Sequence, residues 1–240
     1  MSQLGSAGTV GTRSPTKLRG VLLDVDGTLV LSVDAHARAW SESLAEAGHQ
    51  VPPERVRPLI GMGGDRVLPE LVPGLNDQQD PGKSIVERRR QIFLERYAPG
   101  LQAAPGSREL LLRMRGSGLR LVAASSAKPD ELTVLLRAAG ADDLIETATS
   151  SDDAESSKPA PDIVHAALER SGLRPEEVLM LGDTPYDIES ATKARVAVVA
   201  LRCGGFPEST LDGAVAVYDD PAHLLREYDQ SPFGVPTPAG

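Results

Sequence analysis

The fold is decided by the stretch RGVLLDVDGTL at residues 19–29. Its apolar run, residues 21–23, is followed by turn chemistry at Gly27, a pattern that predicts a buried strand of a parallel sheet. Asp24 and Asp26 then lie at the carboxyl end of that strand. Because side chains of an extended chain alternate with a period of two, we expect both carboxylates on one side, where they repel unless a cation separates them.

Two interpretations of this Asp-x-Asp-Gly sequence compete. Asp and Gly are common turn residues, so the sequence could be only a strand-ending turn. However, Asp24 directly continues an apolar run, where an ionised side chain is costly unless it is paired or bound to a metal. Mg2+ prefers oxygen ligands and suits a site of one or two carboxylates plus a substrate phosphate. The stretch therefore favours a Mg2+ site, and Gly27 would let the backbone approach the phosphate closely.

The hexapeptide DVDGTL at residues 24–29 resembles the first motif of the haloacid dehalogenase superfamily of phosphohydrolases. The resemblance implies that Asp24 is the nucleophile and that Asp26 is the general acid/base. The true dehalogenases of the superfamily lack the second acid. The presence of Asp26 therefore favours phosphoryl transfer over carbon–halogen chemistry.

The composition is that of a globular protein with an aliphatic core, since 40% of the 240 residues are hydrophobic and only 3% are aromatic. The net charge of −9 argues against nucleic-acid binding. The basic run at residues 88–90 is interpreted as a solvated helix face. Cys203, the single cysteine, can form neither an internal disulfide nor a zinc site and is expected to pack. With no apolar signal segment and no long apolar run, the sequence predicts a cytoplasmic protein without a membrane segment.

Residues 32–103 carry helical patterns and no strand signal. Helices are expected over 33–48 and 84–97, with Pro52 and Pro53 opening another element between them. An all-helical insertion directly after the first strand resembles the cap of the phosphoglycolate phosphatase and beta-phosphoglucomutase-like branch of the superfamily. The expected domains are a disordered tail at 1–16, a core at 17–31 and 104–230, a helical cap at 32–103 and a disordered tail at 231–240.

The glycine-rich loop at residues 61–64 fits neither the dinucleotide fingerprint nor the phosphate loop of nucleotide hydrolases. It is either a tight helix–helix connection or, as in the caps that this chain resembles, a loop that reaches over the active site and selects the substrate. In the second case Gly63 and Arg66 are candidates for substrate contact, although Arg66 is equally well explained as a solvated residue.

The sequence HARAW at residues 36–40 resembles the first cap helix of beta-phosphoglucomutases, where the His and the Trp lie near the junction of core and cap. For His36, a place in the site and a packing role are equally supported. For Trp40, a place in the hydrophobic core is the preferred interpretation.

From residue 105 onward, helices alternate with strands, which predicts a parallel sheet with crossover helices and hence a Rossmann-like α/β core. The strands are expected at 119–124, 144–148, 177–181, 196–201 and 215–217. After the first of these, Ser125 and Ser126 precede a helix that starts at Asp130. Hydroxyls and free N–H groups there form either a phosphate cradle or an ordinary helix cap. The segment resembles the superfamily's second motif, which implies that Ser125 binds phosphate.

Two further strings complete the pattern. SSKPAPD at residues 156–162 resembles the third motif, which implies that Lys158 neutralises phosphate, whereas a loop Lys is otherwise usually solvated. GDTPYD at residues 182–187 resembles the fourth motif, which implies that Asp183 binds Mg2+ and that Asp187 supports it. Asp187 is also explained as a helix-capping acid.

In open parallel sheets, ligands bind beyond the carboxyl ends of the strands, so these distant residues can converge on one site. We therefore predict a Mg2+-dependent phosphatase that hydrolyses a small phosphorylated metabolite, of the phosphoglycolate or sugar phosphate class, through an aspartyl-phosphate. The predicted metal site comprises Asp24, Asp26, Asp183 and Asp187, and the predicted phosphate site comprises Ser125, Ser126, Lys158 and Gly27.

Two alternatives stay open. A phosphomutase would pass the phosphoryl group to a second hydroxyl, but no Arg occupies residues 61–64, where the mutases that this chain resembles carry one. A catalytically silent binding module on the same fold would not need the complete set of acids and the Lys. The sequence leaves open whether the protein is a monomer or a homodimer.

Overall fold

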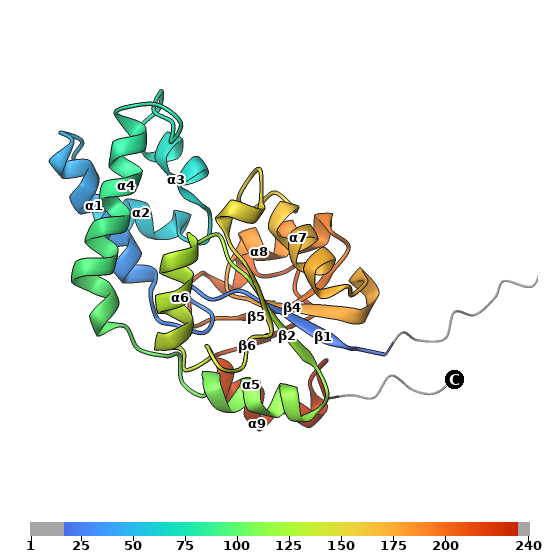
Figure 1. The fold of residues 1–240 in the computed structure, drawn as a ribbon. Helices are drawn as coiled ribbons and strands as arrows, with labels where there is room; N and C mark the ends of the chain where they lie inside the picture. The colour runs from blue at the N-terminus through green and yellow to red at the C-terminus, as the bar shows by residue number, and fades with distance from the viewer. Residues whose placement is uncertain (1–16, 235–240) are drawn as a thin grey trace, which may run out of the picture.

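The computed structural model describes residues 17–234, and its centre is a parallel sheet of six strands in the order β3-β2-β1-β4-β5-β6 (Figure 1). The strands are β1 (Gly20–Leu23), β2 (Arg120–Ala124), β3 (Thr147–Thr149), β4 (Val178–Gly182), β5 (Ala197–Leu201) and β6 (Ala216–Tyr218). Strand β1 pairs in parallel with both β2 and β4. The sheet therefore grows outward from β1 in both directions, which creates the crevice where open α/β sheets bind ligands.

The two faces of the sheet belong to different hydrophobic clusters, because strand side chains alternate between faces. Val21 and Leu23 of β1 pack in one cluster, and Leu22 packs in the other. All three are completely buried. Each such side chain contributes about 1.5–3 kcal/mol by leaving water. A strand buried on both faces reads as a continuous aliphatic run, which is why residues 21–23 predicted it.

Helices cover both faces (Figure 1). One face is packed by α5 (Ser107–Gly116), α6 (Pro129–Ala138) and α9 (Pro221–Arg226), and the other by α7 (Asp162–Ser171) and α8 (Pro185–Lys193). Short 3₁₀ helices lie at Arg57–Leu59, Ala98–Gly100, Ser151–Asp153, Pro175–Glu177, Glu208–Thr210 and Tyr228–Gln230. This α/β architecture is the one that the sequence predicted.

The insertion between β1 and α5 forms a lobe beside the sheet, at the upper left of Figure 1. It contains α1 (Val33–Glu46), α2 (Pro53–Val56), α3 (Gly64–Leu71) and α4 (Gly82–Ile92), with a π-helical turn at Phe93–Tyr97. Within 32–103 the described chain contains no strand. The lobe has a hydrophobic cluster of its own, built around Trp40, Leu44 and Leu68. Trp40 is thus a core residue, as preferred, and the division into cap and core domains stays a prediction.

Some expected boundaries differ from the structure. The helix expected over 84–97 is interrupted at Phe93, where the backbone continues as a π-helical turn. The strand expected over 144–148 is β3, which begins at Thr147, because Leu144 ends a hydrogen-bonded turn from Ala141. The prediction of a disordered tail from residue 231 is wrong for its first residues, because Phe233 is buried in the hydrophobic core. The Pro/Gly-rich composition of this segment gave no sign of that packing. The tail expected at 1–16 and the rest of the C-terminal tail, 235–240, lie outside the described residues.

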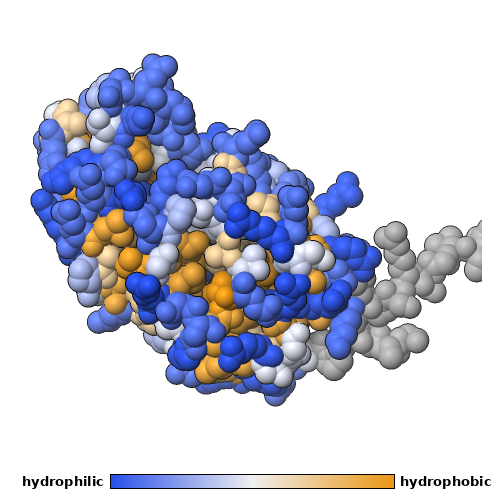
Figure 2. Space-filling model, viewed as in Figure 1, coloured by the Kyte–Doolittle hydropathy of each residue, from blue (hydrophilic) through white to orange (hydrophobic). Residues whose placement is uncertain are grey.

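The surface of the helical lobe is largely hydrophilic at its outer end, whereas hydrophobic residues gather toward the middle of the face drawn in Figure 2. Among residues 17–234, no helix combines the length and the apolar character needed to cross a bilayer.

Candidate active site

Four loops converge at the carboxyl ends of the central strands. Asp24 follows β1, Ser125 follows β2, Asp183 follows β4, and Lys158 lies in the loop before α7. All four residues are buried, with at most 4% of their surface exposed. Parallel strands deliver their carboxyl ends to one edge, so residues far apart in sequence meet there.

Lys158 connects two of the acids. Its Nζ lies 2.6 Å from Asp24 Oδ1 and 2.7 Å from Asp187 Oδ1. The Lys158 side chain is completely buried. The interpretation of Lys158 as a solvated loop residue is therefore wrong, because a buried ammonium is tolerated only where carboxylates compensate its charge.

Asp187 has two roles at once. Its Oδ2 accepts hydrogen bonds from the Thr184 N–H at 3.1 Å and the Thr184 hydroxyl at 2.7 Å, which completes a capping box at the start of α8. Its Oδ1 meanwhile faces Lys158. The explanation of Asp187 as a helix cap is therefore correct, and its support of a metal, which would use the other oxygen, stays a prediction.

Burial opposes the ionisation of Asp24 and Asp183. Burial raises the pKa of Asp24 to about 7 against the opposing effect of Lys158, and Asp187 adds to the rise. Burial also raises the pKa of Asp183 well above its usual value, with further repulsion from Asp24 and Asp187. For Lys158, burial would lower the pKa, but Asp187 and Asp24 raise it. Lys158 therefore stays protonated, whereas its single positive charge does not offset the burial of Asp24 and Asp183.

Asp183 shows where positive charge is lacking. Its Oδ1 accepts a hydrogen bond from the Thr28 hydroxyl at 2.7 Å, but its buried Oδ2 has no hydrogen-bond partner among the described residues. A Cβ on Gly27 or Gly204 would collide with this carboxylate, so both glycines keep space beside it. A buried carboxylate oxygen without a partner is costly unless a cation or ordered water meets it.

These acids fit a hard divalent cation. Asp24, Asp183 and Asp187 each offer a carboxylate oxygen, and the three oxygens lie within 4.8 Å of one another. Mg2+ prefers oxygen donors and suits one or two carboxylates, with waters and a substrate phosphate completing its ligands. The side chain of Asp26 is not part of this group, so the predicted metal contact of Asp26 would have to involve its backbone carbonyl.

Asp26 instead faces the helical lobe. Its Oδ1 lies 2.8 Å from His36 Nε2 and accepts a hydrogen bond from the Ser32 hydroxyl. Burial would raise the pKa of Asp26, but His36 and Ser32, with Arg89 farther away, hold it below its usual value. His36 also stacks on Phe93 with ring centroids 3.9 Å apart. His36 therefore packs on Phe93 and also contacts Asp26, and its role in a functional site stays a prediction.

Arg89 is the residue that sequence reasoning placed wrongly. The sequence predicts a solvated helix face for residues 88–90, but the Arg89 side chain is only 10% exposed and forms an ion pair with Glu131 of α6. A signal was present: Arg89 lies four residues after Ile85 and three before Ile92, on the apolar stripe of α4. Glu131 had a similar signal, since it lies one and four residues before the buried Leu132 and Leu135.

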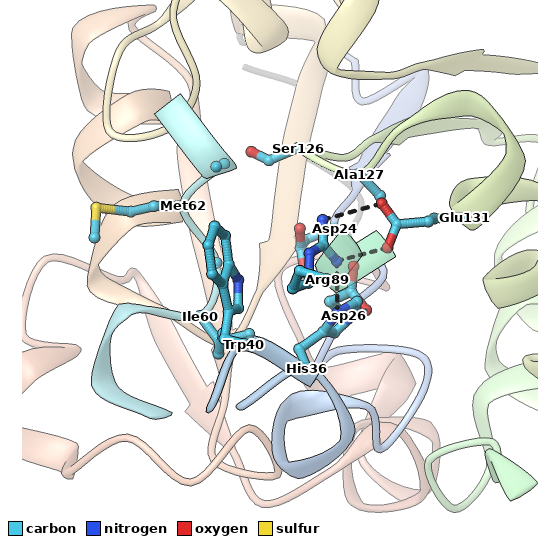
Figure 3. A pocket seen from close by; sticks show the side chains of 13 residues that line it. Asp24, Asp26, His36, Trp40, Ile60, Met62, Arg89, Ser126, Ala127 and Glu131 are labelled. Atoms are coloured by element: carbon cyan, nitrogen blue, oxygen red, sulfur yellow. Dashed lines mark hydrogen bonds and ion pairs between the residues drawn. The ribbon is translucent and has the colours of Figure 1, made fainter. Parts of the chain in front are cut away.

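A cavity of about 50 Å³ lies over these groups, with Asp24, Asp26, His36 and Arg89 in its lining. In Figure 3, Arg89 lies between Trp40 and Glu131. The volume suits a small ligand, because a cavity of roughly 10–15 Å³ already holds a single water.

The predicted phosphate residues are placed differently from one another. Ser126 lines the cavity, and its buried hydroxyl has no hydrogen-bond partner among the described residues. Ser125 is buried outside the lining and accepts a hydrogen bond from the Ala127 N–H at 3.1 Å. Gly27 does not reach the cavity either: its N–H donates to the Val30 carbonyl at 2.8 Å, so it is not free for phosphate.

The glycine loop of the lobe docks on the loop that carries Lys158. The Gly63 N–H donates to Ser157 Oγ at 3.0 Å, and Asp65 accepts hydrogen bonds from the Ser157 N–H and hydroxyl. Gly63 also lines the cavity. Arg66 does not: its side chain is 48% exposed and lies nearest to Asp65, so its interpretation as a solvated residue fits the structure.

Cys203 packs against the first loop, as predicted, with its thiol 3.1 Å from the Gly27 carbonyl. Burial and the nearby Asp183 raise its pKa to about 12, so the thiol stays protonated and is a poor nucleophile.

Comparison with known proteins agrees with this geometry. A family profile described as haloacid dehalogenase-like hydrolase matches residues 18–195. The chain belongs to this family. A phosphoglycolate phosphatase of Rhodospirillum rubrum is 31% identical over 214 residues, which cover 86% of this chain and 89% of that protein.

Solved structures agree as well. A hydrolase from Pseudomonas syringae has a TM-score of 0.82 and 31% identity, with 89% of this chain and 98% of that chain covered. A CbbY mutant from Rhodobacter sphaeroides, in complex with xylulose-(1,5)bisphosphate, has a TM-score of 0.75 and 25% identity, with 86% of this chain and 96% of that chain covered. The predicted family, the α/β fold class and a phosphatase are thereby confirmed.

Proposed function

We propose that this protein is a Mg2+-dependent phosphatase that hydrolyses a small phosphate monoester, of the phosphoglycolate or sugar phosphate class, through an aspartyl-phosphate on Asp24. The observation that carries the proposal is the position of Lys158 Nζ, 2.6 Å from Asp24 Oδ1 and 2.7 Å from Asp187 Oδ1. Nearby, Asp183 Oδ2 has no hydrogen-bond partner within residues 17–234. Burial of Lys158 between two acids, with a third acid nearby, is costly for the fold, but this arrangement suits the charge of a transferring phosphoryl group.

In the first half-reaction, an Asp24 carboxylate oxygen attacks phosphorus and the bond from phosphorus to the leaving oxygen breaks. Lys158 favours the ionised form that this attack needs, because it offsets the effect of burial on Asp24. Asp26 donates a proton to the departing alcohol. In the second half-reaction, Asp26 takes a proton from the water that hydrolyses the aspartyl-phosphate.

The surroundings of Asp26 orient its carboxylate, and its lowered pKa favours the base step of this role. His36 and Ser32 both contact Oδ1, so that oxygen is held in place. The other oxygen, Oδ2, is left to exchange protons with the alcohol and with water. Both Asp24 and Asp26 line the same cavity, which is the arrangement that a shared substrate requires.

The residues suited to hold Mg2+ are Asp24 and Asp183, with the Asp26 carbonyl and Asp187 in support. A bound Mg2+ would supply positive charge opposite the phosphoryl oxygens. Lys158 and Ser126, with Ser125 behind it, would contact the phosphate from the protein side. The helical lobe, predicted to be a cap, would exclude bulk water from the reaction.

The test is phosphate release from a panel of phosphorylated sugars, hydroxy acids and nucleotides, with Mg2+ or with a chelator, beside an Asp24→Asn control. Mg2+-dependent release that the control lacks is the expected result. Interconversion of sugar phosphate isomers without release would replace the proposal with a phosphomutase. Inactivity in both assays would leave a binding module. A cytoplasmic location stays a prediction.

A further inference from the structure

Arg89 and Glu131 form a buried ion pair at the edge of the cavity that Asp24 and Asp26 line. Arg89 NH1 donates to Glu131 Oε1 at 2.6 Å, and NH2 donates to Oε2 at 3.2 Å. The Glu131 side chain is 1% exposed and that of Arg89 is 10% exposed. Arg89 comes from α4 of the helical lobe and Glu131 from α6 of the core (Figure 3). Both terminal nitrogens of the guanidinium are therefore committed to one carboxylate.

The rest of the guanidinium is also held. NH1 lies 3.3 Å from His36 Nδ1, and the Arg89 Cζ lies 5.4 Å from the centre of the Trp40 ring. Because a guanidinium only donates, Nδ1 of His36 accepts, and Nε2 carries the hydrogen that faces Asp26. The buried Nε of Arg89 alone has no hydrogen-bond partner in the described chain.

The cavity offers no uncommitted cation to a substrate. Among its lining residues, all within the described range, Asp24, Asp26 and Glu131 are acids, and the one Lys or Arg is Arg89, which Glu131 neutralises. Lys158 is outside the lining, between Asp24 and Asp187. In the adjoining hollow, Arg90 and Lys128 each face an acid, Asp130 and Asp152.

Building on the proposed phosphatase function, we infer that Glu131 makes the site selective for monophosphates whose leaving group is neutral and hydroxylated, and against those that carry a second anionic group. A second anion in this cavity would have to take Arg89 away from Glu131. That exchange would leave a buried carboxylate without a counter-charge, which is strongly unfavourable.

A hydroxylated leaving group meets no such obstacle. The Glu131 carboxylate has about four lone-pair positions, of which Arg89 uses two, so it can still accept from a substrate hydroxyl. The Nε–H of Arg89 can donate to a hydroxyl oxygen. Both groups can act while the ion pair stays intact, so a small polyol or sugar monophosphate fits the chemistry of the cavity.

The test uses substrates that differ only at the group in question. Glycerol 3-phosphate carries a CH2OH where 3-phosphoglycerate carries a carboxylate. In the same way, 2-hydroxyethyl phosphate carries a CH2OH where phosphoglycolate carries a carboxylate. For the wild-type protein, we expect kcat/KM to favour the hydroxyl member of each pair by about tenfold or more. A preference for the carboxylate members would overturn the inference.

The decisive variant is Glu131→Gln, which keeps the shape and frees Arg89. We expect this variant to lower the ratio of kcat/KM between hydroxyl and carboxylate substrates by about tenfold or more, through a gain on the carboxylates. Asp130→Asn is the matched control, because Asp130 pairs with Arg90 between the same two helices but does not line the cavity. An unchanged ratio in Glu131→Gln, or an equal change in Asp130→Asn, would overturn the inference.

A binding measurement separates this inference from the proposed function. Calorimetric titration of the Asp24→Asn protein with the same substrate pairs gives the preference without turnover. Tighter binding of the hydroxyl members, with no phosphate release by wild type, would refute the phosphatase and support the selectivity. Phosphate release by wild type, with tighter binding of the carboxylate members or with no binding of either, would support the phosphatase and refute the selectivity. Should Glu131→Gln fail to fold, the double variant Arg89→Met/Glu131→Leu, in which no charge is left unpaired, is expected to lose the preference.

Discussion

Lys158 Nζ lies 2.6 Å from Asp24 Oδ1 across 134 residues of sequence, with both side chains buried. The same Nζ lies 2.7 Å from Asp187 Oδ1. One ammonium thus faces a carboxylate from the loop after β1 and another from the first turn of α8. These contacts lie beyond two strands that the sheet places side by side, and Lys158 favours the ionised form of Asp24 against the effect of burial.

Lys158→Met should reduce both activity and stability. Removal of one partner of a buried ion pair typically costs about 3–5 kcal/mol, because the remaining charges are uncompensated. Loss of a cation that faces the developing charge should lower kcat by about 10²-fold or more. Urea unfolding and phosphate release measure the two effects.

The control for this variant is Lys128→Met, because Lys128 pairs with Asp152 at the surface, where both side chains are about half exposed. Exposed pairs contribute about 0–1 kcal/mol, so its unfolding midpoint should barely move. Equal losses in the two variants would contradict a special role for Lys158.

Asp26→Asn should abolish turnover while it leaves the first attack possible. An amide has no proton to give to the leaving alcohol and cannot activate water, so kcat should fall by about 10²–10⁴-fold. With a substrate whose leaving group needs no proton, such as 4-nitrophenyl phosphate, Asp24 should stay phosphorylated. Intact-protein mass spectrometry would then show one added phosphoryl group.

Asp34→Asn is the matched control for that experiment, since the Asp34 side chain is 68% exposed and contacts Arg57. This variant should turn over normally. Undiminished turnover in Asp26→Asn would remove Asp26 from the mechanism.

Mg2+ should stabilise the wild-type protein against heat, and Asp183→Asn should lose this effect. A ligand at 100 times its dissociation constant adds about 2.7 kcal/mol to the free energy of unfolding. Without Mg2+, the same variant should be at least as stable as wild type, because it lacks the buried Asp183 carboxylate, one oxygen of which has no partner in the described part of the chain. Differential scanning fluorimetry with Mg2+ or a chelator measures both.

Asp212→Asn, at an exposed position, serves as the control and should keep the Mg2+ response. A full Mg2+ response in Asp183→Asn would show that the cation binds elsewhere.

The parts of the site that could be predicted from sequence are those that follow buried strands. Asp24 comes directly after an apolar run and Asp183 one residue after the next such run, and a buried acid there needs a partner. Lys158 was predicted only through the resemblance of its motif, because nothing local distinguishes it from a solvated Lys. The α/β fold itself followed from the alternation of strands and helices.

Contacts between the helical lobe and the core could not be predicted in the same way. Arg89 and Glu131 are 42 residues apart, and although each lies on the apolar stripe of its own helix, neither local pattern names the other residue as its partner. Only the tertiary packing of α4 against α6 brings them together. For Gly27 the sequence predicted a phosphate contact, but a structural reason for the glycine is sufficient. Its φ is +79°, and a Cβ there would collide with Asp183.

Glu177 should make the stability of the protein depend on pH in the acidic range. Hydrogen bonds from the Arg174 side chain and N–H lower the pKa of Glu177 to about 2, with a further contribution from Arg19. An acid with a lowered folded-state pKa stabilises the fold above its unfolded pKa of about 4.3 and loses that effect as pH falls through the folded value. Glu177→Gln should therefore be less stable than wild type at pH 6, and the difference should vanish toward pH 2.

Urea midpoints at several pH values measure this difference, with Glu176→Gln as the control. The Glu176 side chain is 49% exposed, so its replacement should have a smaller effect. A difference between wild type and Glu177→Gln that grows as pH falls would contradict the assignment.

Gly63→Ala should impair the site through the loop of Lys158. The backbone of Gly63, with φ −81° and ψ 171°, is open to any residue, so only its surroundings require glycine. A Cβ there would lie 2.7 Å from both Cβ and Oγ of Ser157, the residue before Lys158. The displacement should lower kcat/KM by about 10–100-fold. Ser157→Gly in the same chain should restore part of the activity by removing the clash, whereas Gly100→Ala, where a Cβ meets no atom within 4 Å, should change nothing. Full activity of Gly63→Ala would show that the docking of this loop does not control the site.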